Sequence, residues 1–181
     1  MSKFNHLAEA HAVKNTKHVF TRTLDGIDEC KNADYLKMDC QGAELKTLFG
    51  AEDVLNDISV VQTEVLFLEM YLFAPLFHDI DMKLQHAGFN LHRFLGSGKM
   101  YGMPFKPSKN TKEPHRPISQ AIWGDVVYVE DFMAFDDIGR FMPERLLKTA
   151  AILNDIYNST DLVHYALSHC GRAKQYEEWQ K

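Results

Sequence analysis

The stretch Asp34-Tyr-Leu-Lys-Met-Asp-Cys-Gln-Gly-Ala-Glu44 decides the fold of this 181-residue chain. Its apolar start predicts a β-strand over 35–38 that ends at Asp39. Gly42 then provides a turn into a helix that carries Glu44. The pattern puts a carboxylate at the carboxyl end of a strand, which is the edge where open α/β sheets form their ligand sites.

Strand and helix patterns alternate along the rest of the chain. They predict helices over 43–56 and 75–87, strands over 58–67, 89–95 and 121–129, and two closing helices, one starting at Pro143 and one capped by Ser159 or Thr160. Gly50, in the middle of the first predicted helix, is interpreted as a mark of close packing on the sheet. We therefore expect an α/β fold with a mostly parallel, doubly wound sheet.

Composition excludes several classes of protein. The net charge of −5 gives no general attraction to nucleic acid or to anionic membranes. No apolar run approaches the roughly 20 residues that span a bilayer, and the N-terminus has no apolar signal-peptide core. Three widely spaced cysteines without a Cys-x-x-Cys pair indicate a reduced, cytoplasmic protein.

Several segments resemble the FkbM-type methyltransferases, which are S-adenosylmethionine-dependent enzymes with a Rossmann-like sheet. The resemblance rests on the opening stretch together with Thr23-Leu-Asp25, Leu48-Phe-Gly-Ala-Glu52 and Val61-Gln-Thr-Glu-Val65. It implies that the predicted strands are strands 4-5-6-7, the second half of a class I methyltransferase sheet, with the last two forming its one antiparallel pair. It also implies an N-terminal arm (1–22), a partial methyltransferase domain (23–135) and a C-terminal helical appendage (136–181).

The chain departs from the family at the cofactor loop. The family's first half begins with a strand and a glycine-rich Asp-x-Gly-Ala-Asn-x-Gly type loop, and nothing before Asp39 has that pattern. We therefore expect the chain to represent the C-terminal half of a methyltransferase. The strand over 35–38 would then be an exposed edge, covered by residues 1–22, by a second copy or by a partner chain.

The resemblance also implies site residues. Asp39 and Glu64 are the candidate catalytic carboxylates, because methyl transfer to oxygen often needs a base that takes the proton of the acceptor. Asp39, Gln41 and Gly42 are the candidate contacts to S-adenosylmethionine. Three of these residues also have a structural explanation: Asp39 can cap the following helix, Glu64 can pair with Lys37, and Gly42 can be a requirement of the backbone. Likewise, Glu44 can complement the helix dipole.

The segment 96–120 is a long loop rich in lysine, glycine and proline. Its Lys99 and Lys106 are candidates for contact with an anionic acceptor such as a sugar phosphate, although such a loop is also typical of a solvated surface. No metal site is expected, because the histidines and cysteines lack a recognised ligand spacing.

Two functions follow from these observations. The first is an S-adenosylmethionine-dependent O-methyltransferase acting on a hydroxyl of a sugar or another small molecule, with no nucleic-acid or membrane partner. The alternative is a non-catalytic truncated or assembly module that keeps the fold without the cofactor site.

Overall fold

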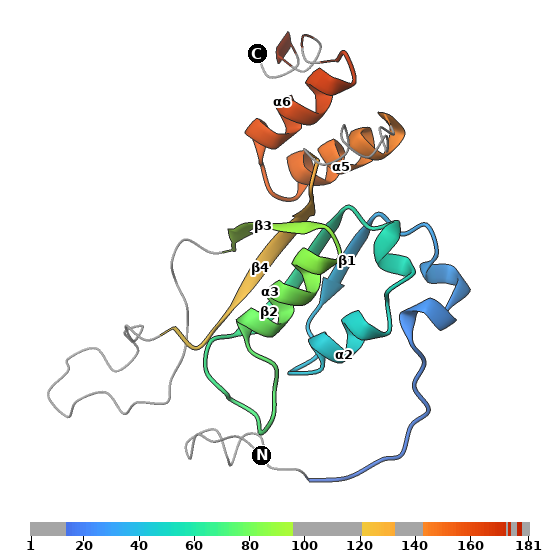
Figure 1. Ribbon diagram of the computed structural model, residues 1–181, viewed down its shortest axis with the longest axis vertical. Coiled ribbons are helices and arrows are strands. Elements are labelled where there is room, and N and C mark those ends of the chain that lie inside the picture. Colours follow the sequence, from blue (N-terminus) through green and yellow to red (C-terminus); the bar gives the residue numbers. More distant parts are fainter. Residues whose placement is uncertain (1–13, 96–120, 133–142, 173, 175–176, 179–181) are drawn as a thin grey trace, which may run out of the picture.

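The structure is a computed structural model that describes residues 14–95, 121–132, 143–172, 174 and 177–178. The described strands form one four-stranded sheet. Figure 1 shows α2 and α3 on one face of this sheet and the pair α5–α6 near one end of the strands. The main elements are β1 (Tyr35–Met38), α2 (Glu44–Phe49), β2 (Val60–Leu66), α3 (Phe77–His86), β3 (Phe89–Phe94), β4 (Trp123–Glu130), α5 (Pro143–Asp155) and α6 (Thr160–His169). Three short 3₁₀ turns lie at Leu24–Gly26, Asp28–Cys30 and Val54–Asn56.

The strands lie in the order β1-β2-β4-β3. β1 and β2 are parallel, whereas β4 is antiparallel to both β2 and β3. β1, β2 and β3 therefore run in one direction and β4 runs in the other. The described sheet contains one parallel pair and two antiparallel pairs, so the expectation of a single antiparallel pair was wrong. Burial explains the order: β4 buries its four residues from Val126 to Val129 and needs neighbours on both sides, whereas β3 exposes Asn90 and Phe94 and suits an edge.

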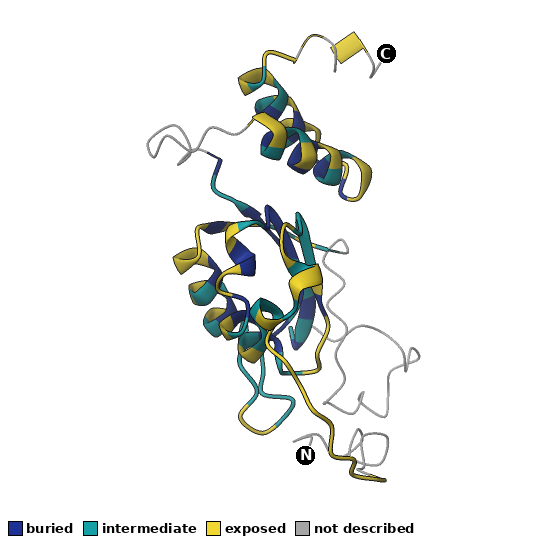
Figure 2. Cartoon of the chain, turned by 90° about the vertical axis from the view of Figure 1, so that its right-hand side faces the viewer, coloured by how far each residue is buried: buried dark blue, intermediate teal, exposed yellow. Residues whose placement is uncertain are grey.

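The first face of the sheet forms the larger core. Ile80 and Leu84 lie four residues apart on α3, and they pack with Leu48 of α2 against Val61 and Val65 of β2. Figure 2 shows the buried residues of these helices turned toward the sheet. This core fixes the turns that follow β1 and β2, where the candidate site lies.

The second face is covered near the amino end of β2 by the α5–α6 pair. Val60, Val127 and Val129 of the sheet pack with Leu153 of α5 and Val163 of α6. Arg145 joins α5 to the sheet, donating to Oε2 of Glu130 at 2.7 Å and to the carbonyl oxygens of Asn56 and Ile58 at 2.6 and 2.9 Å.

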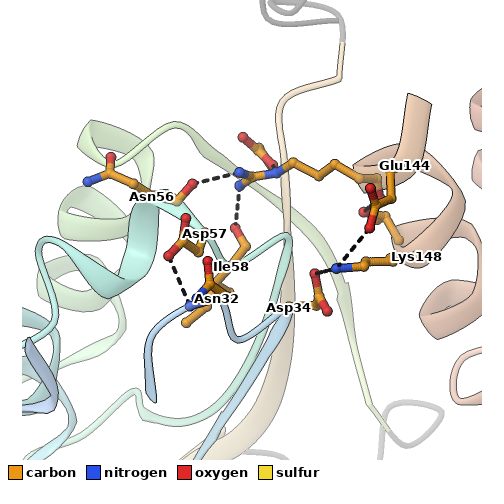
Figure 3. Close-up of polar contacts among 10 residues, drawn as sticks. Asn32, Asp34, Asn56, Asp57, Ile58, Glu144 and Lys148 are labelled. Carbon is orange, nitrogen blue, oxygen red and sulfur yellow. Dashed lines mark hydrogen bonds and ion pairs between the residues drawn. The ribbon is translucent and has the colours of Figure 1, made fainter. Parts of the chain in front are cut away.

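The same junction carries a second cation. Figure 3 shows Lys148 between Asp34, at the start of β1, and Glu144 of its own helix. Its Nζ lies 3.3 Å from Oδ1 of Asp34 and 3.7 Å from Oε1 of Glu144. The carbonyls of Asn56 and Ile58 that accept from α5 lie beside this group (Figure 3). The C-terminal helices are therefore attached near the amino ends of β1 and β2, whereas the candidate site lies at their carboxyl ends.

The first helix is shorter than predicted. It ends at Phe49, and Gly50 is its C-cap residue. A Cβ on Gly50 would lie 3.0 Å from Cγ2 of Thr23, so the close packing at this glycine is against the segment before β1 and not against the sheet. Asp25 then accepts the N–H groups of Asp53 and Val54, which starts a separate 3₁₀ turn.

Among the described strands, β1 is an edge, as expected. Residues 14–22 are exposed and form no strand, so this part of the N-terminal arm does not cover β1. Residues 1–13 lie outside the described part. In the ranges that the structure describes, no helix has the length and apolar character needed to cross a bilayer.

Candidate functional site

Four carboxylates gather at the carboxyl end of β1 and β2. Asp39 follows Met38 directly, and Met38 pairs with Thr63, the residue before Glu64. Glu64 in turn pairs with Asp125 of β4. Glu44, in the first turn of α2, is the fourth member and acts electrostatically on Glu64 together with Asp39 and Asp125. The structure thus brings together the two carboxylates that the sequence predicted.

Glu64 is the group most affected by this arrangement. Burial first, and then the charges of Asp39, Glu44 and Asp125, raise its pKa from an ordinary value of 4.5 to about 7. Lys37 acts in the opposite direction as the weakest influence. Within the described residues Lys37 and Glu64 form no ion pair, so the predicted pairing with Lys37 does not explain this carboxyl group. Glu64 therefore exchanges its proton near neutral pH.

Glu44 holds the turn between β1 and α2. Its side chain is 4% exposed, and its two carboxylate oxygens accept the N–H groups of Cys40 at 2.7 Å and Gly42 at 2.9 Å. Gly42 has a φ of +95°, a backbone conformation that a residue with a Cβ adopts only under strain. Glu44 thus has a specific structural role beyond the general helix-dipole effect, and Gly42 is required by the backbone.

Asp39 is exposed and does not cap α2. The N-cap residue is Ala43, without a side-chain hydrogen bond, so the capping explanation for Asp39 was wrong. Oδ1 of Asp39 instead accepts a hydrogen bond of 2.7 Å from Nε2 of Gln41. Oε1 of Gln41 accepts a hydrogen bond of 2.9 Å from the hydroxyl group of Tyr71, in the loop after β2. Two of the three candidate cofactor residues, Asp39 and Gln41, are therefore connected to the neighbouring loop.

Sequence reasoning did not assign Tyr71 or Asp125 to the site. Asp125 carried a usable signal, because it interrupts an apolar strand just as Glu64 does. Tyr71 lies in an irregular loop where no periodicity applies, and only the tertiary structure reveals its contact. The candidate acceptor residues Lys99 and Lys106 lie outside the described residues.

The described residues also bear on metal binding. Among them, no group of three or more histidine, cysteine, aspartate or glutamate side chains is arranged to hold a metal ion. The site is thus a cluster of carboxylates with one amide and one phenol. An arrangement of this kind can exchange a proton at Glu64 and can attract a positively charged ligand.

Comparison with known proteins finds a family model that matches the segment containing most of this site. Residues 2–91 match the model of the methyltransferase FkbM domain. The match includes Asp39, Gln41, Gly42 and Glu64, whereas Asp125 lies outside it. Neither the curated proteins nor the solved structures give a match. Residues 2–91 are therefore similar to the methyltransferase FkbM domain.

Proposed function

We propose that the chain takes part in the transfer of a methyl group from S-adenosylmethionine to a hydroxyl group of a small acceptor such as a sugar, with Glu64 as the proton acceptor. The observation that supports this proposal most is the pKa of Glu64, raised to about 7 at the edge of the sheet where ligands bind. A general base is most effective when its pKa lies near the working pH.

The residues present fit the charged part of the cofactor. S-adenosylmethionine, when bound, supplies its methyl group on a positively charged sulfonium. The cluster of Asp39, Glu44, Glu64 and Asp125 favours a cation electrostatically. Asp39, Gln41 and Gly42 would hold the cofactor, because Asp39 and Gln41 are exposed at the carboxyl end of β1.

The proposal extends to the residues that hold the rest of the cofactor. The 181 residues contain no Asp-x-Gly-Ala-Asn-x-Gly type loop, and β1 has a neighbour on one side only in the described sheet. An unpaired strand edge is a ready surface for another strand. We therefore place the residues that hold the methionine part of the cofactor outside these 181 residues, on a segment or a second copy that pairs along β1. The free cysteines among the described residues favour a reducing compartment, the cytoplasm, for this assembly.

The chain's own residues have distinct roles in this reaction. Glu64 would accept the proton of the acceptor hydroxyl while its oxygen bonds to the methyl carbon, as that carbon's bond to the sulfonium sulfur breaks and leaves S-adenosylhomocysteine. The neighbouring carboxylates make this transfer more favourable, since their charges strengthen the hold of Glu64 on the proton. Asp39 lies beside Glu64 at the open edge of the sheet and orients the reacting groups.

The experiment combines binding with catalysis. Calorimetry with S-adenosylhomocysteine, with light scattering on the same sample, tests cofactor binding and oligomeric state. Transfer of a labelled methyl group to a panel of sugars and sugar phosphates, measured between pH 6 and 9, tests the reaction. We expect Glu64→Gln to keep its affinity for S-adenosylhomocysteine, which lacks the sulfonium charge, and to lower kcat about 100-fold, the scale of general base catalysis. Glu52→Gln, in the same family segment but outside the cluster, is the matched control.

Two results would count against the proposal. If Glu64→Gln keeps the full kcat, as the control Glu52→Gln does, Glu64 is not the general base. If the folded protein binds no cofactor and transfers no methyl group, alone or with its partner, the alternative of a non-catalytic assembly module is favoured.

A further inference from the structure

We infer that Tyr71 is a positioning residue of this site, which fixes the side chain of Gln41 and through it the carboxylate of Asp39. The inference rests on the proposed function for its catalytic consequence, but its structural part stands on the contacts alone. Neither the family match nor the sequence assigns this role to Tyr71.

The hydrogen bonds give the connection a direction. The Tyr71 hydroxyl donates to Oε1 of Gln41, and Nε2 of Gln41 donates to Oδ1 of Asp39. If the amide turned over, its oxygen would face the carboxylate and lose the hydrogen bond to Asp39. The carboxylate of Asp39 only accepts and therefore selects the amide nitrogen, and the phenol donates to the Oε1 that then faces it.

Gln41 needs this support because little else holds it. Its side chain is exposed, and its backbone has a φ of +52°, in the left-handed region. An exposed glutamine side chain without a partner samples several rotamers, because this freedom is favoured by conformational entropy. The contact with Tyr71 provides that partner, from a loop that follows a different strand.

Tyr71 is itself fixed by packing. A Cβ on Gly42 would lie 3.4 Å from Cδ2 of Tyr71 and 3.4 Å from Cβ of Ala74, so the ring lies directly over the glycine of the turn. The N–H of Ala74 donates to the carbonyl of Tyr71 at 3.2 Å, which closes the loop. Burial, then the charges of Glu64, Glu44 and Asp39, raise the pKa of the Tyr71 phenol, so that it remains a donor at physiological pH.

The test uses Tyr71→Phe, which removes the hydroxyl and keeps the ring, together with Gln41→Leu and the double variant. The first readout does not depend on activity. NMR relaxation of the Gln41 side-chain amide should show an ordered group in the native protein and a mobile one in Tyr71→Phe, with an order parameter below about 0.6. Gln85, whose Nε2 donates to Asp81 at 2.7 Å, provides a control resonance that stays unchanged.

The second readout is methyl transfer. We expect Tyr71→Phe and Gln41→Leu each to lower kcat about tenfold, with KM for the acceptor unchanged, and the double variant to be no worse than either. An ordered Gln41 amide in Tyr71→Phe would overturn the inference, as would losses that multiply in the double variant. If the native protein transfers no methyl group, the proposed function fails, while the amide readout still decides whether Tyr71 positions Gln41.

Discussion

Replacement of Glu64 by glutamine should make the protein more stable at alkaline pH. The substitution keeps the size and polar character of the side chain but removes its charge. In the native protein, burial and three neighbouring carboxylates raise the pKa of Glu64 from 4.5 to about 7. The folded state therefore holds this proton to a higher pH than the unfolded state does. The unfolding free energy consequently falls as the pH rises from about 4.5 to about 7.

The size of the effect follows from the same pKa. At 1.36 kcal/mol per pKa unit, the rise corresponds to an upper limit of about 3 kcal/mol. Water still reaches part of the Glu64 side chain and screens its neighbours, so we expect about 1–2 kcal/mol. The loss of unfolding free energy caused by ionisation of Glu64 in the folded protein is complete above pH 7 and absent below pH 4.5. The glutamine variant, which does not titrate, should show no such loss.

Urea unfolding at a series of pH values between 4.5 and 8.5 measures this difference. The advantage of Glu64→Gln over the native protein should be about 1–2 kcal/mol larger at pH 8 than at pH 4.5. Glu29→Gln, at an exposed position away from the cluster, serves as the control and should show no comparable change. A difference between Glu64→Gln and the native protein that is constant across the series would refute the reasoning, because it would mean that Glu64 ionises alike in both states.

Two further substitutions test the supports of the site and of the sheet. Arg145→Met should cost about 2–4 kcal/mol in unfolding free energy, measured by urea at pH 7. The reason is that the Arg145 and Glu130 side chains are only 18% and 13% exposed and two backbone carbonyls lose their donor; a cost near zero would contradict this account. Gly42→Ala should cost about 1–3 kcal/mol in unfolding free energy through backbone strain at a φ of +95°. Gly88→Ala is the matched control, because Gly88 has a similar φ of +88° but open space where the Cβ would lie. It therefore tests backbone strain without the contacts to Tyr71.

The strands could be predicted from the sequence because their signals are local. The runs that predict strands over 35–38, 89–95 and 121–129 correspond closely to β1, β3 and β4. The helix predicted over 43–56 failed at Gly50 because its end depends on a distant segment: Thr23 packs on that glycine, and Asp25 starts the next turn. Periodicity within one window carries no information about such contacts.

Strand order shows the same limit. The resemblance implied one antiparallel pair, but the chain places β4 between β2 and β3 and forms two. Which strand lies in the centre is decided by burial on both faces, and the four buried residues from Val126 to Val129 select β4. A pattern of apolar residues predicts that a strand is buried, but it does not name the neighbours.

The site was predictable as far as it depends on the ends of strands. Asp39 follows Met38, Glu64 follows Thr63, and Met38 and Thr63 are partners on the parallel strands β1 and β2. The proximity of Asp39 and Glu64 therefore follows from the sequence pattern and the geometry of parallel sheets. The contact between Tyr71 and Gln41 depends on how an irregular loop folds over Gly42, and no sequence rule fixes that path.

The pairing of Glu64 with Asp125 is the strongest reason to regard the cluster as functional. Like charges opposite each other on neighbouring strands destabilise a sheet, and these two residues are partners in the register of β2 and β4. An apolar or oppositely charged residue at either position would give a more stable sheet. Stability alone therefore does not account for the pair. A site that needs a carboxyl group with a pKa near 7 does account for it, because the charge of Asp125 helps to raise the pKa of Glu64.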